Sequence, residues 1–497
     1  MARNLLAALF CAAATNALPQ GGIRAALREA AQQRNSRAAH SKDAAERYFT
    51  HKPNAAVERY LTQRLDHYDA SLRNASFQQR YFVNATNYKN GGPVFLCVGG
   101  EGPALDATVV SRSVHCSDAT ELAPSVGALI VALEHRYYGK SVPPSTERGA
   151  QRLRHLTSHQ AVVDIATFHK HIRAEFKLPS STKWVTFGGS YPGMIAGFAR
   201  LRLPHLIHAA VSSSAPWHAK VDMVEYNDRV GAALANRAVG GYGACQKLVV
   251  DGHAKIKSLL EASRLQRLAI AKLFNFCNPL ALENKQARKA WARNGVVSIP
   301  AQSNEPASTD PAQSIGALCS VLLAANASSS VDALATLSSR QQGGRCVGVD
   351  LAEVKDDGTD LLSWPWQTCA EFGFYQSCEV GSQCPFARGY ASVADEISIC
   401  AQFGLTPAMV ADNVAFSNDV YGGAQPKGSR ILFPNGDVDP WTGLGVLKSP
   451  APTEPVMMVV GASHHAWTHP ADTVTQQTVR DAKSAIQAQV TQWLAVE

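Results

Sequence analysis

Short apolar runs of strand length alternate with longer helical segments over much of the chain. In the N-terminal half the runs that are continuous in apolar or β-branched residues are 93–98, 126–133, 183–187 and 208–214, and the segment 159–172 has a helical pattern. Continuous apolar strands separated by helices are typical of a parallel sheet covered by helices on both faces. The alternating, aromatic-rich segment 77–83 is a further predicted strand. The pattern therefore predicts an α/β fold with a mostly parallel sheet.

The strand pattern stops at Trp217 and returns near residue 429. Between them lie helical segments such as 254–274 and 314–325, a polar loop at 301–311 and eight of the cysteines. We interpret this region as an inserted, mainly helical cap domain held by disulfides, whose pairing many connectivities could satisfy. The later elements are strands at 429–433 and 456–460 and an amphipathic helix at 473–494. The predicted divisions are a core in two parts, 54–216 and 401–497, and the cap, 217–400.

The first residues have the form of a targeting segment. Arg3 precedes the apolar stretch 5–14, and small residues follow it at 15–17, as in a secretory signal peptide spanning residues 1–17. Four arginines between residues 24 and 37 leave a mitochondrial presequence as the alternative. Residues 18–53 are rich in Ala, Arg and Gln and poor in large apolar residues, so we expect a flexible pro-segment or N-terminal extension.

Composition narrows the class of protein. The chain has 497 residues, 46% of them hydrophobic, and a net charge of +7 without a dense basic run interleaved with aromatic residues, so nucleic-acid binding has little support. No apolar run reaches membrane length, and we expect no membrane span. The oligomeric state stays open, with a homodimer as one option.

Cysteines and glycosylation motifs favour the secretory route. Removal of Cys11 with the signal peptide leaves ten cysteines, an even number that fits disulfides in an oxidising compartment. Asn74, Asn84 and Asn326 each begin an Asn-X-Ser/Thr acceptor motif. We therefore expect a secreted or a lysosomal or vacuolar protein.

Ser190 stands where a predicted strand passes into a predicted helix. Gly188 lies two residues before it, as in a nucleophile elbow, where only small neighbours tolerate the strained turn. The glycine usual two residues after the serine is replaced by Pro192 and displaced to Gly193, which the first turn of a helix can accept. An ordinary Gly-Gly-Ser loop is the alternative interpretation.

Two further candidates complete a catalytic triad. A serine hydroxyl becomes nucleophilic when a histidine takes its proton and a carboxylate orients that histidine. The chain offers Ser190, Asp439 and His464, each just after a predicted strand and in the α/β-hydrolase order of serine, acid and histidine. Asp437 and His465 are the competing positions.

A metal site has weaker support in this region. His465 and His469 have helical ligand spacing, but no nearby Glu or Cys completes the set, so we expect neither a metal nor an organic cofactor. The predicted oxyanion hole uses the backbone N–H groups of Tyr191 and Gly100. The glycines at 99–102 could also form a plain tight turn, and they lack the further glycine of a dinucleotide fingerprint.

At these motifs the chain resembles the serine peptidase family of lysosomal prolyl carboxypeptidase, dipeptidyl peptidase II and thymus-specific serine protease, and its thymus-specific branch most. The similar stretches are 91–93, 99–103, 134–141, 188–191, 213–216, 364–376, 435–441 and 461–465. The resemblance implies an α/β-hydrolase core with a helical cap. It also implies that Asp439 is the acid and His464 the base.

For specificity, the resemblance implies trimming of short peptides after a penultimate proline. Met194 and Trp441 are the first candidates to line an apolar proline slot, followed by Trp467, Trp364 and Trp366. By the same resemblance, Glu101 would capture a free substrate amine. The arginine that prolyl carboxypeptidase and dipeptidyl peptidase II carry shortly after the histidine pair is absent from 466–469, which speaks against carboxypeptidase action.

These observations together predict a serine exopeptidase of dipeptidyl-peptidase or Pro-X carboxypeptidase type that acts on peptide substrates through an acyl-enzyme at Ser190. The alternatives are an esterase or lipase on the same fold and a catalytically silent binding protein with a hydrolase fold.

Overall fold

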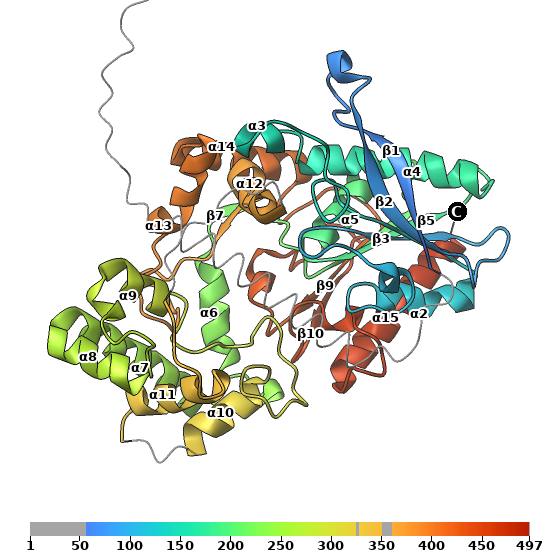
Figure 1. Cartoon of the computed structure of the whole chain (residues 1–497). Helices are drawn as coiled ribbons and strands as arrows, with labels where there is room; N and C mark the ends of the chain where they lie inside the picture. The colour runs from blue at the N-terminus through green and yellow to red at the C-terminus, as the bar shows by residue number, and fades with distance from the viewer. Residues whose placement is uncertain (1–55, 325–327, 350–359, 497) are drawn as a thin grey trace, which may run out of the picture.

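A computed structural model of the chain describes residues 56–324, 328–349 and 360–496 (Figure 1). The predicted signal peptide, the whole of the predicted N-terminal extension and Asn326 lie outside these residues.

The centre of the molecule is an eight-stranded sheet with the strand order β1-β2-β4-β3-β5-β6-β9-β10. The strands from β4 to β10 in this order are parallel to their neighbours, while β1 pairs with β2 and β2 with β4 antiparallel. The bounds are β1 Val57–Arg64, β2 Ser76–Asn84, β3 Val94–Val98, β4 Leu129–Leu133, β5 Trp184–Gly189, β6 Ala209–Ser213, β9 Ile431–Gly436 and β10 Val456–Val459. The predicted, mostly parallel sheet is confirmed.

Helices bury both faces of this sheet, which is why its central strands are continuous apolar runs. Val94 and Leu96 of β3 pack with helices α4 (Ser158–Glu175) and α5 (Tyr191–Arg202) on one face. Phe95 of the same strand packs with the helices of the other face, α2 (Ser117–Val126) and α15 (Gln477–Ala495), which lie side by side in Figure 1. Alternate residues of one strand therefore serve two cores.

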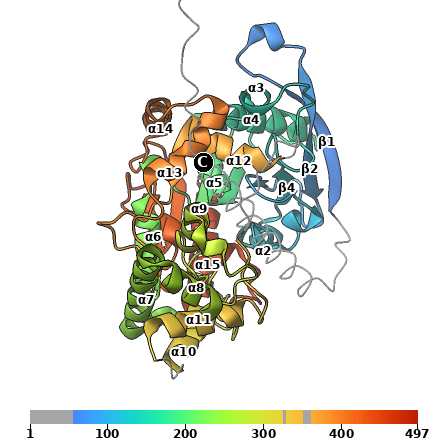
Figure 2. The ribbon, with the colours of Figure 1, turned by 60° about the vertical axis from the view of Figure 1, so that its left-hand side comes forward.

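The inserted region is helical and has two parts that pack differently. One group of helices builds a core of its own and lies together, away from the sheet, in both ribbon views (Figure 2). Its members are α7 Gly243–Ala262, α8 Arg264–Leu273, α9 Lys285–Ala292, α10 Ile315–Ala324 and α11 Ser330–Gln341, with α6 Val224–Ala233 leading into them.

The second part packs on the main core. Tyr421 of α14 stacks on Phe198 of α5 with ring centroids 3.6 Å apart. The elements of this part are α12 Ser363–Gln367, the π-helical turn η6 Thr368–Phe372, β8 Gly373–Tyr375, α13 Val393–Ile397 and α14 Pro407–Tyr421, and β8 pairs with β7 Lys220–Asp222. The domain boundaries at residues 217 and 400 stay predictions.

One predicted helix is divided in the structure. The segment expected as a single helix at 254–274 spans the end of α7 and all of α8, separated at Ser263. Ser263 has an extended backbone, and its side chain accepts a hydrogen bond from the backbone N–H of Gln266, so it caps α8. Serine competes for backbone hydrogen bonds in this way at helix starts.

Five disulfides account for ten cysteines of the described residues. One joins β3 to the start of α2, and four lie in the inserted region. The pairs are Cys97–Cys116, Cys245–Cys319, Cys277–Cys346, Cys369–Cys400 and Cys378–Cys384. The prediction of a disulfide-held insertion is confirmed.

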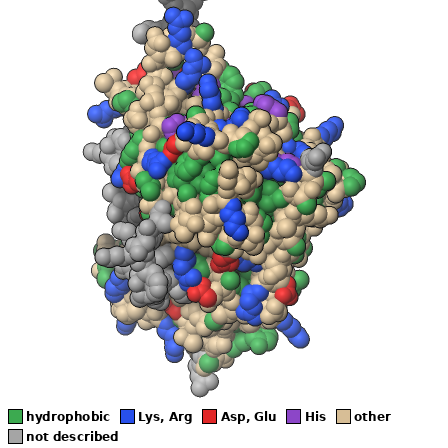
Figure 3. Space-filling model, turned by 90° about the vertical axis from the view of Figure 1, so that its right-hand side faces the viewer, with side chains coloured by type: hydrophobic (Ala, Val, Ile, Leu, Met, Phe, Trp, Pro, Cys, Tyr) green, Lys and Arg blue, Asp and Glu red, His purple; other side chains and the backbone are tan. Residues whose placement is uncertain are grey.

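Two surface properties bear on partners. Within the described ranges, no helix combines the length and apolar character needed to cross a bilayer. On the face shown in Figure 3, Lys and Arg side chains are scattered among acidic, polar and apolar ones rather than gathered in a basic band.

Candidate functional site

The turn after β5 holds Ser190 in a strained conformation. Its φ is 64° and its ψ −134°, a region that side chains rarely adopt, and its N–H donates to Ser213 O on the neighbouring strand (2.9 Å). A Cβ on Gly188 would come within 2.3 Å of Pro192 O, so only glycine fits there. The turn therefore has the strain and the close packing that the sequence pattern predicts.

Pro192 and Gly193 explain the irregular glycine spacing. Pro192 lies in the first turn of α5, where its missing N–H costs no helical hydrogen bond. A Cβ on Gly193 would lie 2.9 Å from both Gly188 O and Ser213 O, so the close approach to β6 occurs at this position.

The loop after β3 lies directly against the same turn. A Cβ on Gly100 would lie 2.2 Å from Pro192 Cγ, so the loop can approach this closely only because Gly100 has no side chain. Tyr191 is the first residue of α5, and the N–H of a first helical residue has no partner within its helix. The structure thus brings the loop of Gly100 beside the helix start at Tyr191.

Asp439 and His464 form a buried pair. His464 Nδ1 lies 2.9 Å from Asp439 Oδ2, and Asp439 Oδ1 accepts the N–H of Trp441 (2.9 Å). The Asp439 side chain is fully buried and His464 is 7% exposed. Because a carboxylate accepts hydrogen bonds, the proton is on Nδ1, and Nε2 carries the free lone pair. Nε2 is buried and has no hydrogen-bond partner among the described residues.

The competing candidates have other partners. Asp437 Oδ1 accepts the N–H of Gly461 (2.6 Å), and its Oδ2 accepts from Asn236 Nδ2 (3.2 Å). His465 donates its backbone N–H to Ser214 Oγ (2.9 Å), and its ring packs on Gly189. Burial, and then the rings of neighbouring histidines, lower the pKa of His465 well below its usual value, so it is neutral.

A residue of the inserted region touches this pair. His464 donates its backbone N–H to Gln302 O (3.2 Å), and Gln302 Oε1 accepts from Trp441 Nε1 (3.2 Å) and from Tyr226 OH (2.8 Å). The sequence analysis did not single out Gln302, because a glutamine in a polar loop has no periodicity or motif to mark it.

The proposed substrate-contacting residues differ in placement. Met194 and Trp467 are fully buried, and Trp467 Nε1 donates to Ser213 Oγ (2.9 Å). Trp441 is 6% exposed, and its ring centroid lies 6.2 Å from that of His464. Glu101 is half-buried in the loop after β3. Of these four, Trp441 lies beside His464, and Met194 donates its backbone N–H to Ser190 O (3.0 Å).

The two described glycosylation candidates also differ. Asn74 is exposed, whereas Asn84 is half-buried and its Nδ2 donates to Val110 O (2.9 Å). Both assignments stay predictions, and a glycan on Asn84 would replace one of the two hydrogens of this Nδ2.

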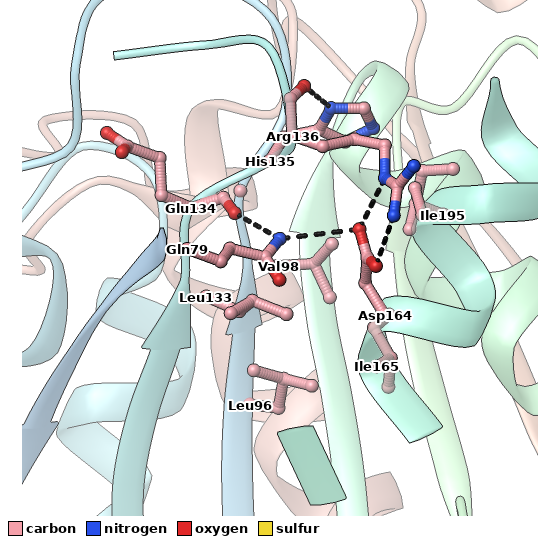
Figure 4. Close-up of a pocket in the computed structure, with 12 residues that line it drawn as sticks. Gln79, Leu96, Val98, Leu133, Glu134, His135, Arg136, Asp164, Ile165 and Ile195 are labelled. Carbon is pink, nitrogen blue, oxygen red and sulfur yellow. Dashed lines mark hydrogen bonds and ion pairs between the residues drawn. The ribbon is translucent and has the colours of Figure 1, made fainter. Parts of the chain in front are cut away.

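A cavity of about 10 Å³ lies behind the loop of Gly99, between β3, β4, α4 and α5. Figure 4 shows its polar wall, in which Gln79 Nε2 donates to Glu134 O (2.9 Å) and Arg136 binds both carboxylate oxygens of Asp164 (2.6 Å each). This volume is about that of one water molecule, so the cavity is part of the support of the loop and no substrate site.

The described residues contain no group of three His, Cys, Asp or Glu side chains that could hold a metal ion. The rings of His465 and His469, the pair with ligand spacing in the sequence, have centroids 6.4 Å apart.

Comparison with known proteins identifies the family. The family model described as "Serine carboxypeptidase S28" matches residues 63–486. The chain belongs to this family. Thymus-specific serine protease of Mus musculus is 35% identical over 464 residues, covering 89% of each chain, and that of Homo sapiens is 34% identical, covering 88% of this chain and 86% of the relative. Lysosomal Pro-X carboxypeptidase of Bos taurus is 24% identical, covering 88% of each chain.

These matches confirm the resemblance that the sequence motifs indicate, including its leaning toward the thymus-specific branch. Family and fold together make the protein a serine-type peptidase with an α/β-hydrolase core and a helical insertion.

Proposed function

We propose that the protein is a serine exopeptidase in which Ser190 is the nucleophile, His464 the general base and Asp439 the residue that orients it. The observation that carries the proposal is the buried pair of His464 Nδ1 and Asp439 Oδ2, 2.9 Å apart, while no group in the described part of the chain hydrogen-bonds to Nε2. The strained serine turn lies in the same region, since His465 packs on Gly189 next to Ser190.

In the proposed reaction, His464 Nε2 takes the Ser190 hydroxyl proton as Oγ attacks the substrate carbonyl. The imidazolium, stabilised by Asp439, then gives this proton to the leaving amine as the C–N bond breaks, which leaves an acyl-enzyme. Water attacks the acyl carbonyl while His464 takes its proton, and His464 then returns a proton to Ser190 Oγ as the bond between Oγ and the acyl carbon breaks, which releases the acid product. The N–H groups of Tyr191 and Gly100 would stabilise the oxyanion in both steps.

The proposed substrates are short peptides cleaved after a penultimate proline. Trp441 lies in edge-to-face contact with Tyr226 and Phe374, with centroids 5.5 and 5.6 Å away, so an aromatic wall stands beside His464. A proline ring is apolar and rigid, and aromatic faces suit it. Glu101 would hold the free amine of a dipeptidyl-peptidase substrate. Residues 466–469 lack the arginine that both prolyl carboxypeptidase and dipeptidyl peptidase II carry, which speaks against carboxypeptidase action in particular.

We further propose a secretory-pathway location, either secreted or lysosomal. The signal-like N-terminus and the five disulfides support it, and some relatives are lysosomal enzymes. A homodimer stays a prediction of the sequence analysis.

The test uses the mature glycosylated protein, a fluorophosphonate probe and a panel of short peptides with proline next to either end. We expect labelling at Ser190 and hydrolysis of some proline peptides, both lost in Ser190→Ala and retained in the surface variant Ser484→Ala. Absence of labelling would overturn the proposal in favour of a silent binding protein. Labelling with ester but no peptide turnover would favour an esterase, and the peptide end that is cleaved decides the exopeptidase type.

A further inference from the structure

The side chain of Tyr191 lies in a polar network that the proposed reaction does not use. Tyr191 directly follows the candidate nucleophile and is 1% exposed. Its hydroxyl lies 3.0 Å from His135 Nε2 and accepts a hydrogen bond from Gln367 Nε2 (2.7 Å). His135 follows β4 of the core, whereas Gln367 belongs to α12 of the inserted region. The hydroxyl therefore joins two parts of the chain that are far apart in sequence.

Each hydrogen bond in this network has a defined direction. His135 Nδ1 lies 2.7 Å from Arg136 O, a contact visible in Figure 4, and since a carbonyl only accepts, Nδ1 carries the proton. Burial lowers the pKa of His135 to about 4, so the ring is neutral near neutral pH and Nε2 is an acceptor. Tyr191 OH therefore donates to His135. On the other side, Gln367 Oε1 accepts from Tyr138 OH (2.5 Å), which leaves its amide N–H to donate to Tyr191.

Both ends of the network are fixed. Arg136 is fully buried and bidentate to Asp164 of α4 (2.6 Å each), so the carbonyl that holds His135 has little freedom. Gln367 is also fully buried. The ring of Tyr191 packs against Trp364 and Phe372, which precede and follow Gln367 in the sequence, with ring centroids 5.6 and 5.8 Å from its own.

We propose that His135 and Gln367 are positioning residues that hold Tyr191, and through its backbone N–H the oxyanion site, in the reactive geometry. An oxyanion donor is effective only within a few tenths of an ångström of its place. A tyrosine ring fixed at its far end restrains its own backbone. In this arrangement the inserted region supplies part of the catalytic geometry through Gln367, and the inference rests on the proposed function.

The first test replaces Gln367 by methionine, which has a similar shape and no hydrogen bonds. Gln367→Met should lower kcat and the rate of fluorophosphonate labelling of Ser190 by about tenfold or more, with KM changed less than about threefold. The matched control is Ser417→Ala, which removes another buried hydrogen bond of the inserted region, Ser417 Oγ to Glu371 O (2.7 Å), without touching Tyr191. A folded Gln367→Met variant with wild-type kcat and labelling rate would overturn the proposal.

A second variant gives a measurement that a purely structural role of Gln367 would leave unchanged. In Gln367→Glu the introduced carboxyl can donate to Tyr191 only when it is protonated. The titratable groups around it are Tyr138, Tyr191 and Glu371, with His135 behind Tyr191. Activity relative to wild type should therefore rise as the pH falls and the carboxyl takes up a proton. A constant ratio at every pH would count against the proposal, and this comparison decides it if the methionine variant does not fold.

Failure of the proposed function would be seen separately. Wild-type labelling and turnover, both lost in Ser190→Ala, establish a serine hydrolase with Ser190 as its nucleophile whatever the Gln367 variants do. If the wild-type protein neither labels nor hydrolyses, the proposed function has failed. If it does both and the Gln367 variants behave as wild type, only the positioning role has failed.

Discussion

The sheet and the inserted region contribute to the candidate site in different ways. Ser190, Asp439 and His464 follow the strands β5, β9 and β10, whose ends a common sheet fixes relative to one another. The inserted region contributes Gln302 from a loop and Gln367 from a short helix, which hydrogen-bond to Trp441 after β9 and to Tyr191 after β5. In the proposed function the chemistry therefore lies at the strand ends of the rigid sheet, and the insertion adjusts it from outside.

The two parts of the insertion also differ in how they contact the rest of the molecule. Helices α7–α11 have a separate core, which includes Val438 next to Asp439, and the loop of Gln302 bonds the N–H of His464. The segment α12–α14 shares the main core, with Phe372 and Tyr421 packed among residues of α5. A change in the second part should therefore affect both folding and catalysis, whereas a change in the first should affect substrate contacts more.

The largest effect is expected at the acid. Asp439→Asn replaces an acceptor at His464 Nδ1 by an amide that can donate, so the histidine loses its oriented tautomer, and kcat should fall by about 10³- to 10⁴-fold. Asp437→Asn is the matched control two residues away and should cost only a few-fold, since Asp437 bonds Gly461 and Asn236 instead. Steady-state kinetics on the best peptide of the panel measures both, and equal losses would mean that the acid is misassigned.

The second-largest effect is expected at Gly100, where the loop after β3 packs closely against the serine turn. In Gly100→Ala the added methyl group would lie 2.2 Å from Pro192 Cγ, so the loop or the serine turn must move, and kcat should fall by about a hundredfold. Gly243→Ala at the start of α7 is the control, because a methyl group there meets nothing within 4 Å. The labelling rate of Ser190 reports the same loss, and a variant that keeps its rate would show that Gly100 does not shape the oxyanion site.

The same contrast explains what the sequence could predict. The strands of the parallel sheet are continuous apolar runs such as 93–98 and 183–187, and a parallel sheet places its strand ends at one edge, so Ser190, Asp439 and His464 could be named together. Their roles still depend on the resemblance, because Asp437 and His465 have equivalent positions in the pattern. The structure distinguishes them by their hydrogen-bond partners.

The contributions of the insertion could not be predicted in this way. Gln302 and Gln367 contact Trp441 and Tyr191 through side-chain hydrogen bonds that span more than a hundred positions, and no local pattern encodes such a contact. The break at Ser263 and the π-helical turn at Thr368–Phe372 are likewise set by caps and packing rather than by periodicity. The pairing of the cysteines could be assigned only from the three-dimensional fold.

A pH effect on stability should appear where the insertion meets helix α4. Glu371 is 5% exposed, accepts hydrogen bonds from the N–H and the hydroxyl of Ser158 on α4, and has its pKa raised by burial to about 7. A raised carboxyl pKa means that the folded state holds the proton more tightly than the unfolded state does. Its contribution to stability is fully present below about pH 4.5, the ordinary pKa of the carboxyl, and is lost as the pH rises through 7. The loss amounts to about 3 kcal/mol.

In Glu371→Gln this loss is absent, so the variant should gain stability relative to wild type as the pH rises from about 4.5 to 8. Buried histidines such as His135 and His253, whose pKa values burial lowers to about 4, act in the opposite direction, but they are common to both proteins and cancel in the difference. Asp118→Asn on α2 is a positive control and should show the same direction of change, since burial also raises the pKa of Asp118 to about 7. Denaturant unfolding at several pH values measures the difference, and a constant value would contradict the assignment to Glu371.

The smallest effect is expected at Gln302, where the separate helical part reaches the site. Gln302→Ala removes the acceptor of Trp441 Nε1 and Tyr226 OH, but it keeps the backbone carbonyl that binds the N–H of His464. The aromatic wall should loosen while the triad stays in place, so KM for proline peptides should rise about five- to tenfold with kcat changed less than about threefold. The fluorophosphonate labelling rate, which needs no proline slot, should match wild type. A parallel fall in the labelling rate would mean that this loop positions His464 itself. The insertion would then contribute to the placement of the base as well as to the substrate site.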